Sequence, residues 1–211
     1  MKLCEIFSSI QGESSFAGYP CVFIRLSGCN LRCSYCDTTY AYAEGEDIEL
    51  NEMINKVRSF GIELVEITGG EPLLQEDVHV LVSQLLYEGY RVLLETNGSM
   101  DISGVDGRVS VILDIKTPSS KMVDRMIMEN LDRVAEKDDV KFVISTEDDY
   151  KWVKEVIQDR SLTERTNVLL SPTYGLLDPS ELVKWMIKDR INARLNLQLH
   201  KYIFGAETKG V

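Results

Sequence analysis

The sequence predicts an α/β fold: a partial, open parallel barrel of about six βα units. After residue 20, short β-rich runs alternate with amphipathic helical patterns, and repeated βα units build a parallel sheet covered by helices. No stretch of Pro, Gly and Ser is long enough to separate domains, so residues 1–211 are expected to form a single domain. A complete eight-unit barrel takes about 250 residues. This chain has 211, and the barrel is therefore expected to stay open.

The expected strands are rich in β-branched and apolar residues and are bounded by turn-forming residues. In chain order they cover 21–27, 63–68, 90–95, 109–115, 140–145, 167–170 and 194–199. Segment 96–108 is rich in glycine and has no helical period. It predicts a loop crossover, rather than a helix, between the third and fourth strands.

The expected helices repeat apolar residues at steps of three and four. Segments 50–60 and 78–86 stop at Gly61 and Gly89, as helices ended by a glycine do. Further helices are expected over 122–135 and over 149–158, the second with Thr146 as its cap. The last covers 179–188, where Asp178 caps the helix and Pro179 takes the first helical position.

Composition and charge exclude several function classes. Against 23 Lys and Arg stand 34 Asp and Glu, which gives a net charge of −11. Nucleic-acid binding relies on Lys and Arg to neutralise phosphates, so no nucleic-acid partner is expected and a small substrate is favoured. The apolar runs are far shorter than the roughly 20 residues that span a bilayer, and no membrane association is expected. The amino terminus lacks a signal-peptide pattern, which predicts a cytoplasmic location.

Three of the five cysteines, Cys29, Cys33 and Cys36, stand at C-x3-C-x2-C spacing directly after the first expected strand. In α/β barrels the loops that follow strands build the active site, so the loop 28–38 lies on the functional face. Three thiolates hold a [4Fe–4S] cluster by three of its four irons and leave one iron open. A zinc site would need a fourth ligand, which neither His79 nor His200 obviously supplies. A group of core thiols without any metal is the remaining alternative.

A second stretch, Thr68-Gly69-Gly70-Glu71-Pro72, follows the next strand. Glycines there let the backbone approach a ligand closely, although alone they would also suit an ordinary turn. With the cysteine triplet, the stretch resembles the radical S-adenosylmethionine superfamily. The resemblance implies that the open iron binds S-adenosylmethionine and that an electron from the cluster yields a 5′-deoxyadenosyl radical, so that the cofactor supplies the difficult chemistry.

A narrower resemblance rests on segments distributed in order along nearly the whole chain: SIQGE at 9–13, FIRL at 23–26, CDT at 36–38, ETNG at 95–98, DIK at 114–116 and QLHK at 198–201. Together they resemble the 7-carboxy-7-deazaguanine synthase family. This resemblance implies ring contraction of 6-carboxy-5,6,7,8-tetrahydropterin to 7-carboxy-7-deazaguanine with loss of ammonia, on the route to queuosine. It also implies a homodimer, Mg²⁺, a regenerated S-adenosylmethionine and an electron donor such as flavodoxin.

The family pattern also implies site residues. It places the [4Fe–4S] cluster on Cys29, Cys33 and Cys36, and Mg²⁺ on Thr38. Residues implied to meet S-adenosylmethionine are Tyr35, Cys36, Asp37, Gly69, Gly70, Glu71, Gly98 and Lys116. Residues implied to meet the substrate are Ile10, Gln11, Gly12, Arg25, Thr96 and Gln198, with catalytic roles for Glu13, Arg25 and His200. The guanidinium of Arg25 suits the substrate carboxylate because it forms two parallel hydrogen bonds to such a group.

Taken alone, several of these residues have ordinary structural explanations. Arg25 alternates with apolar neighbours, which places it either inside the barrel or in solvent. Gln11 and Gly12 suit a turn, and Lys116 suits the exposed end of a strand. For the whole protein, an activase that installs a glycyl radical on a partner protein is the alternative enzyme, and a noncatalytic iron–sulfur or zinc module is the alternative of another class. SIQGE, CDT and QLHK disfavour the first, and the GGEP stretch disfavours the second.

Overall fold

The computed structural model describes residues 1–43, 45–206 and 208–211. The strands within this part are β1 Lys2–Ile10, β2 Pro20–Leu26, β3 Glu46–Asp47, β4 Leu64–Gly69, β5 Arg91–Thr96, β6 Ser110–Ile115, β7 Asp139–Ile144, β8 Asn167–Pro172 and β9 Arg194–Leu195. They form one sheet in the order β3-β1-β2-β4-β5-β6-β7-β8-β9. Neighbouring strands from β2 to β9 are parallel, whereas β1 runs antiparallel to both β2 and β3.

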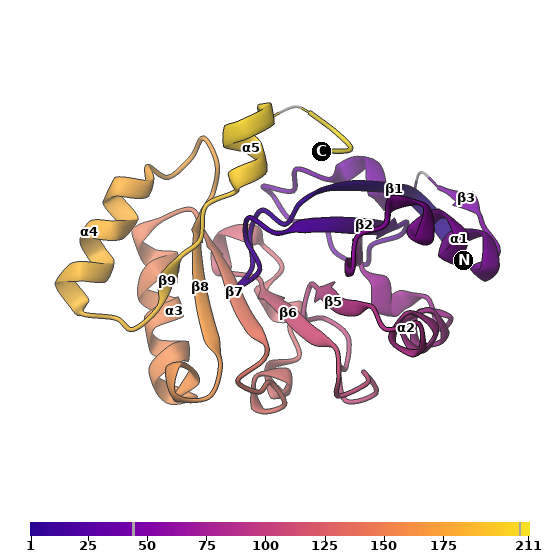
Figure 1. Cartoon of the computed structure of the whole chain (residues 1–211). Coiled ribbons are helices and arrows are strands. Elements are labelled where there is room, and N and C mark those ends of the chain that lie inside the picture. The colour runs from indigo at the N-terminus through magenta and orange to yellow at the C-terminus, as the bar shows by residue number, and fades with distance from the viewer. Residues whose placement is uncertain (44, 207) are drawn as a thin grey trace.

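Helices cover the outer side of this curved sheet. They are α1 Leu50–Phe60, α2 Val78–Tyr87, α3 Glu147–Asp159 and α4 Pro179–Asp189, whereas the short helix α5 Leu199–Phe204 lies at the rim of the barrel. Short 3-10 turns lie at Thr39–Tyr42, Pro72–Leu74, Pro118–Ser120, Val123–Arg125, Met128–Asp132 and Leu162–Glu164. Figure 1 shows α2, α3 and α4 outside the curve of the sheet, while α5 and the C-terminal end lie above β1 and β2. The predicted α/β partial barrel is confirmed.

The helix ends follow the expected capping chemistry. Gly61 follows α1 with a φ of 65°, a left-handed conformation that a glycine adopts without steric cost. The hydroxyl of Thr146 accepts from the N–H of Asp149 (3.2 Å) and the Asp149 carboxylate accepts from the N–H of Thr146 (3.2 Å), which makes a capping box for α3. Asp178 accepts from the N–H of Ser180 (2.8 Å) and so caps α4.

Alternation along the strands divides the apolar side chains between two clusters. The outer cluster takes its strand residues from every second position, such as Ile24 in β2 and Ile67 in β4, and packs them against the helices. The inner cluster consists of Cys21, Phe23, Leu64, Leu93 and Ile112, with Phe7 and Phe16 packed against it. Fully burying one such side chain contributes about 1.5–3 kcal/mol, so both clusters stabilise the barrel. The inner cluster fills the end of the barrel away from the strand C termini.

Three expectations were incomplete or wrong. The strand expected over 194–199 is reduced to β9 Arg194–Leu195, and Leu199 already begins α5. The amino-terminal residues were not expected to form a strand, but β1 pairs with β2 along its length. The helix expected over 122–135 is wrong, because this segment forms only the two 3-10 turns at Val123–Arg125 and Met128–Asp132. The segment instead hydrogen-bonds to the crossover loop. The N–H of Ile127 donates to Gly98 O (2.9 Å), and the buried Asn130 side chain donates to Met100 O (2.8 Å). In the described residues, no helix has the length and apolar character needed to cross a bilayer.

Candidate active site

A cavity of about 570 Å³ opens at the C-terminal ends of the parallel strands. Residues from the loops after β2, β4, β5, β6 and β8 line it, together with residues near both ends of the chain. This is the edge at which α/β barrels assemble their catalytic groups, because successive loops converge there. The sequence segments singled out at 9–13, 36–38 and 198–201 therefore meet around one space, although they are far apart along the chain.

Backbone hydrogen bonds hold the cysteine loop over this cavity. The N–H of Gly28 donates to Ala41 O (2.8 Å), and the carbonyl of Gly28 accepts from Glu71 N–H (2.8 Å). Farther along, the N–H of Ser34 donates to Ser120 O (3.1 Å). The loop is thereby tied to the turns that follow β4 and β6, so its position depends on the barrel and not on local structure alone.

The thiols of Cys29, Cys33 and Cys36 line the same cavity, and all five cysteines are in the thiol form. The sulfur of Cys29 accepts from Leu31 N–H (3.4 Å) and from the side-chain amide of Asn97 (3.8 Å). Burial raises the pKa of Cys33, and the nearby ammonium of Lys116 opposes that rise only in part. Among the described residues, no three His, Cys, Asp or Glu side chains are already gathered to hold a metal ion. The donor set of three thiols with hydrogen bonds to sulfur suits an iron–sulfur cluster.

Two glycines after β4 let the backbone pass against the cysteine loop. A Cβ on Gly69 would lie 2.1 Å from Leu26 O, and one on Gly70 would lie 2.1 Å from Gly28 O and 2.8 Å from Cys29 Cβ. Gly69 also has a φ of 146°. Since real Cβ atoms do not approach backbone so closely, no larger residue fits without displacing the loop. Both glycines line the cavity beside Cys29, which supports a cofactor contact at this point.

Glu71 and Gly98 do not line the cavity, unlike the other residues implied by the family pattern. The buried Glu71 carboxylate accepts from Thr96 Oγ1 (2.9 Å), Asn97 N–H (2.7 Å) and Leu73 N–H (3.0 Å). Burial raises the pKa of Glu71, and these hydrogen bonds oppose the rise. Glu71 therefore fixes the turn that presents Thr96 to the cavity, and Gly98 packs beneath that turn against Ile115.

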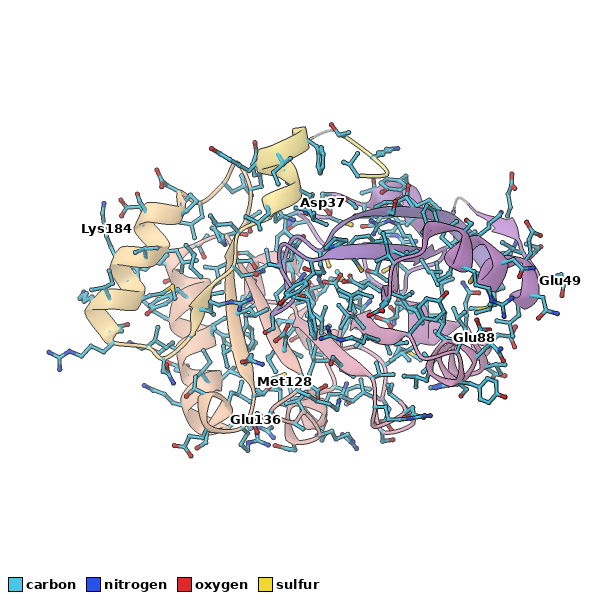
Figure 2. All side chains as sticks on the ribbon, in the orientation of Figure 1. Asp37, Glu49, Glu88, Met128, Glu136 and Lys184 are labelled. Carbon is cyan, nitrogen blue, oxygen red and sulfur yellow. The ribbon has the colours of Figure 1, made fainter. Side chains whose placement is uncertain are left out.

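At the rim, Asp37 connects the cysteine loop to α5, and Figure 2 shows Asp37 beside that helix. Its carboxylate lies 2.5 Å from Lys201 Nζ and 3.4 Å from Gln198 Nε2, and it accepts from Thr38 Oγ1 (3.0 Å). Burial alone would raise the pKa of Asp37, but the ammonium of Lys201 and the hydrogen bonds hold it well below its usual range. Asp37 is therefore an anion at neutral pH, adjacent to Thr38.

Gly12 explains how α5 reaches the cavity. Its carbonyl accepts from Leu199 N–H (3.1 Å), and a Cβ at Gly12 would lie 2.4 Å from Nδ1 of His200. Ile10, at the end of β1, lines the cavity beside it. The side-chain oxygen of Gln11 accepts from Glu13 N–H (2.7 Å) and from the N–H of Ser14 (2.8 Å). Gln11 thus shapes the turn that carries Glu13.

Arg25 lies inside the barrel, with its side chain 17% exposed, and lines the cavity. Its Nε is 2.7 Å from Glu5 Oε1, which also accepts from the hydroxyl of Tyr40 (2.8 Å). Of the two placements that the sequence allowed for Arg25, barrel interior or solvent, the structure has the interior. On the opposite side of the cavity, Lys116 Nζ lies 3.0 Å from Asp114 Oδ1. Burial raises the pKa of the neighbouring Tyr35 to about 12, although Lys116 acts in the other direction.

The floor of the cavity carries charged residues that the sequence interpretation did not assign. Lys141 from β7 ion-pairs with Glu13, Glu95 and Asp114, and Glu66 lies beside them. Four of these residues lie within strands: Glu66, Glu95, Asp114 and Lys141. Glu13 lies outside the strands and pairs with Lys141. A charged residue in the middle of an apolar strand, as in LVEITG or DVKFVI, was the available signal.

The chain is similar to known proteins along its whole length. The family model described as the radical SAM superfamily matches residues 23–159. The 7-carboxy-7-deazaguanine synthase of Chlorobaculum tepidum is 42% identical, with 100% of this chain and 97% of that protein covered. The protein of the same name from Koribacter versatilis is 39% identical over 100% of both chains. The crystal structure of QueE from Escherichia coli is similar with a TM-score of 0.77 at 23% identity, over 93% of each chain.

Proposed function

Because the chain belongs to the radical SAM superfamily and, within it, to the 7-carboxy-7-deazaguanine synthase family, we propose that it converts 6-carboxy-5,6,7,8-tetrahydropterin to 7-carboxy-7-deazaguanine with loss of ammonia. One observation carries the proposal: relatives of that name match over the full length of the chain, including both ends. Those ends are the parts that meet over the cavity, where they would select the substrate.

Cys29, Cys33 and Cys36 would hold a [4Fe–4S] cluster, and S-adenosylmethionine would lie against Gly69, Gly70 and the loop residues Tyr35 to Asp37. When bound, this pair supplies the one-electron chemistry that starts the reaction. The chain positions the pair: the loop is tied to two neighbouring turns, and the glycines leave room beside Cys29. Lys116, which is half-buried and paired with Asp114, would contribute a fixed positive charge toward the cofactor.

For the substrate, Arg25 would bind the carboxylate, since a guanidinium forms two parallel hydrogen bonds to such a group. Glu13 and Gln198 would bind the aminopyrimidinone edge, which presents adjacent donors and an acceptor. Their side chains already lie 2.9 Å apart, from Gln198 Nε2 to Glu13 Oε1. His200 stands beside Gly12 in the same wall, where it would exchange a proton with the substrate ring. Thr96 and Ile10 would complete the pocket.

Mg²⁺ would bind at Thr38. Magnesium keeps several waters and takes further oxygens from its substrate, so a single hydroxyl from the chain is sufficient. The nearby Asp37 carboxylate, anionic at neutral pH, would stabilise the positive charge of the ion. A homodimer, a flavodoxin-like electron donor, a cytoplasmic location and a single domain over residues 1–211 complete the proposal.

The test is anaerobic incubation of the reconstituted protein with S-adenosylmethionine, a reductant, Mg²⁺ and 6-carboxytetrahydropterin, followed by the product's mass. Release of 7-carboxy-7-deazaguanine and ammonia is expected from the wild type and none from Cys33→Ala. If S-adenosylmethionine is cleaved without pterin conversion, the substrate assignment is wrong while the superfamily chemistry stands. A glycyl radical formed on a partner protein would instead favour the alternative activase.

A further inference from the structure

Lys141 is a buried cation beneath the proposed substrate site. It lies in the middle of β7, its side chain is only 5% exposed, and it points into the barrel. Its Nζ lies 3.0 Å from Glu13 Oε2, 2.5 Å from Glu95 Oε1 and 3.1 Å from Asp114 Oδ2. The three carboxylates come from the turn after β1, from β5 and from β6. One ammonium therefore connects three separate parts of the cavity wall.

Three other cations around the cavity already have carboxylate partners, and a fourth, Lys209, lies over the Tyr40 ring. Lys116 pairs with Asp114, Arg25 with Glu5 and Lys201 with Asp37. Within the described residues, Lys141 is the cation that ion-pairs with Glu13 and with Glu95. A carboxylate that loses its ion-pair partner in a buried place keeps the desolvation penalty without the compensating attraction. Both glutamates therefore depend on Lys141.

Glu13 shows this dependence most directly. Burial raises the pKa of Glu13, but the ammonium of Lys141, followed by the charge of His200 and the Gln198 hydrogen bond, brings the pKa below its usual value. Asp37 opposes this effect. Glu13 is nevertheless open to a ligand, because its side chain is 22% exposed and lines the cavity. An ionised carboxylate has about four acceptor positions, so it can accept from Lys141, from Gln198 and from a ligand at once.

Stability alone does not account for this cluster. Replacing a buried ion pair by apolar residues of similar volume is often neutral or stabilising, so a fold gains little by keeping such a pair. The apolar inner cluster that lies deeper in the barrel fills its space without charges. Lys141 and the three carboxylates that pair with it all line the cavity.

We propose that Lys141 is a positioning residue, which holds Glu13 in its ionised form and fixes Glu13 and Glu95 to each other across the floor of the substrate pocket. An ionised Glu13 would accept from the N–H donors of the aminopyrimidinone edge. A protonated Glu13 would instead present its own O–H donor to those N–H groups. This inference rests on the proposed function for the identity of the ligand. The effect of Lys141 on Glu13 does not depend on that identity.

The charged groups that face Lys141 and Glu13 come from the neighbouring elements: Asp37 from the cysteine loop, Glu66 from β4, Glu95 from β5, Asp114 and Lys116 from β6, and His200 from α5, while Arg25 from β2 faces Glu95. The titration of Glu13 must therefore be observed at that carboxyl itself. The full chain without cofactors, labelled with ¹³C at the glutamate carboxyls, allows this by NMR, with the Glu13 signal assigned by its loss in Glu13→Gln.

In Lys141→Met the titration midpoint of Glu13 is expected to rise by about 3–5 pH units, into the range of about 8–9 documented for buried glutamates, since burial then acts without its main opposing charge. Lys154→Met, which removes a surface partner of Asp189, is the matched control and should leave the midpoint unchanged. Should Lys141→Met not fold, Lys141→Met with Glu95→Gln removes the ammonium together with one of its carboxylates and should show the same rise. An unchanged Glu13 midpoint in the folded variant overturns the proposal.

Calorimetry with 6-carboxypterin, an unreactive probe, provides the second arm. Lys141→Met should bind it at least tenfold more weakly than the wild type at pH 7 and should recover part of the loss by pH 9, as Glu13 ionises. An equal loss at every pH would mean that Lys141 is only structural. Turnover of 6-carboxytetrahydropterin by the wild type is the separate test of the proposed function: without product, a raised Glu13 midpoint would still establish the effect of Lys141.

Discussion

The side-chain amide of Gln11 donates to Oε2 of Glu66 across 2.8 Å, in a part of the barrel where both residues are almost fully buried. Burial, and then the neighbouring Glu95, raise the pKa of Glu66 to about 8 from a usual value of 4.5. The Gln11 hydrogen bond and the charge of Lys141 lower the pKa of Glu66, but by less than burial and Glu95 raise it. At neutral pH Glu66 is therefore mostly a neutral acid below the charged layer.

This protonation makes the free energy of unfolding depend on pH. Between the unfolded pKa near 4.5 and the folded pKa near 8, the native state keeps a proton that the unfolded state has lost, so stability falls as pH rises through this window. Each unit of pKa difference corresponds to about 1.4 kcal/mol. Glu66→Gln, which carries no titrating proton, should gain stability relative to the wild type from pH 5 to pH 8. Urea denaturation at both pH values measures this, and a constant difference would contradict it.

Arg25→Ala should weaken the binding of 6-carboxypterin more than Gln198→Ala does. Removing the partner of a neutral polar group costs about 1–3 kcal/mol, and more for a charged one such as the substrate carboxylate. About 1.4 kcal/mol corresponds to a tenfold change in affinity. Binding of S-adenosylmethionine should hardly change in either variant. Calorimetry with each ligand decides, and normal pterin affinity in Arg25→Ala would leave Arg25 as a partner of Glu5 alone.

Cys29→Ala, Cys33→Ala and Cys36→Ala should each abolish the [4Fe–4S] cluster, since three thiolates are the fewest that hold it with one open iron. Cys4→Ala and Cys21→Ala are the controls, because neither thiol lines the cavity. Iron content and the visible absorption of anaerobically reconstituted protein are the measurements. Zinc without iron in the active protein would refute the assignment.

Gly70→Ala should disturb the cysteine loop, since the added Cβ would meet Gly28 O at 2.1 Å and Cys29 Cβ at 2.8 Å. Strain of this kind typically costs about 1–3 kcal/mol. Gly107→Ala is the matched control, because a Cβ there has no neighbour within 4 Å. We expect reduced iron uptake and a lower thermal midpoint in Gly70→Ala only. Full iron content in Gly70→Ala would show that the loop has another way to accommodate the methyl group.

The sequence predicted those parts of the fold that depend on local periodicity. Amphipathic helices such as α1, and the parallel strands, each carry a pattern of apolar residues that is strong enough to predict them from their own sequence. The strand β1 was missed because Glu5 and Phe7 face the inside of the barrel, where a carboxylate pairs with Arg25 and a ring stacks on Phe23, so no simple apolar alternation results. The segment 122–135 has helical spacing, but its polar groups bond to the loop 98–102 instead.

The site residues likewise form two groups, those that the sequence could predict and those that it could not. Residues at the strand ends, such as Cys29 and Gly70, belong to contiguous segments and could be recognised one segment at a time. Lys141 could not, because its importance arises from Glu13, Glu95 and Asp114, which only the folded sheet brings within ion-pairing distance. The roles of these residues in catalysis stay predictions.

The inner cluster around Phe23, Leu64 and Leu93 fills the barrel interior at the end opposite the cavity mouth. Molecules that enter through the mouth pass α5 and the C-terminal residues Thr208 and Lys209, which line it. Of two ligands that share such a vestibule, the one bound deeper has to arrive first and depart last. The order of addition in steady-state kinetics should therefore be compulsory, and a slow exit through that passage would make turnover sensitive to solvent viscosity.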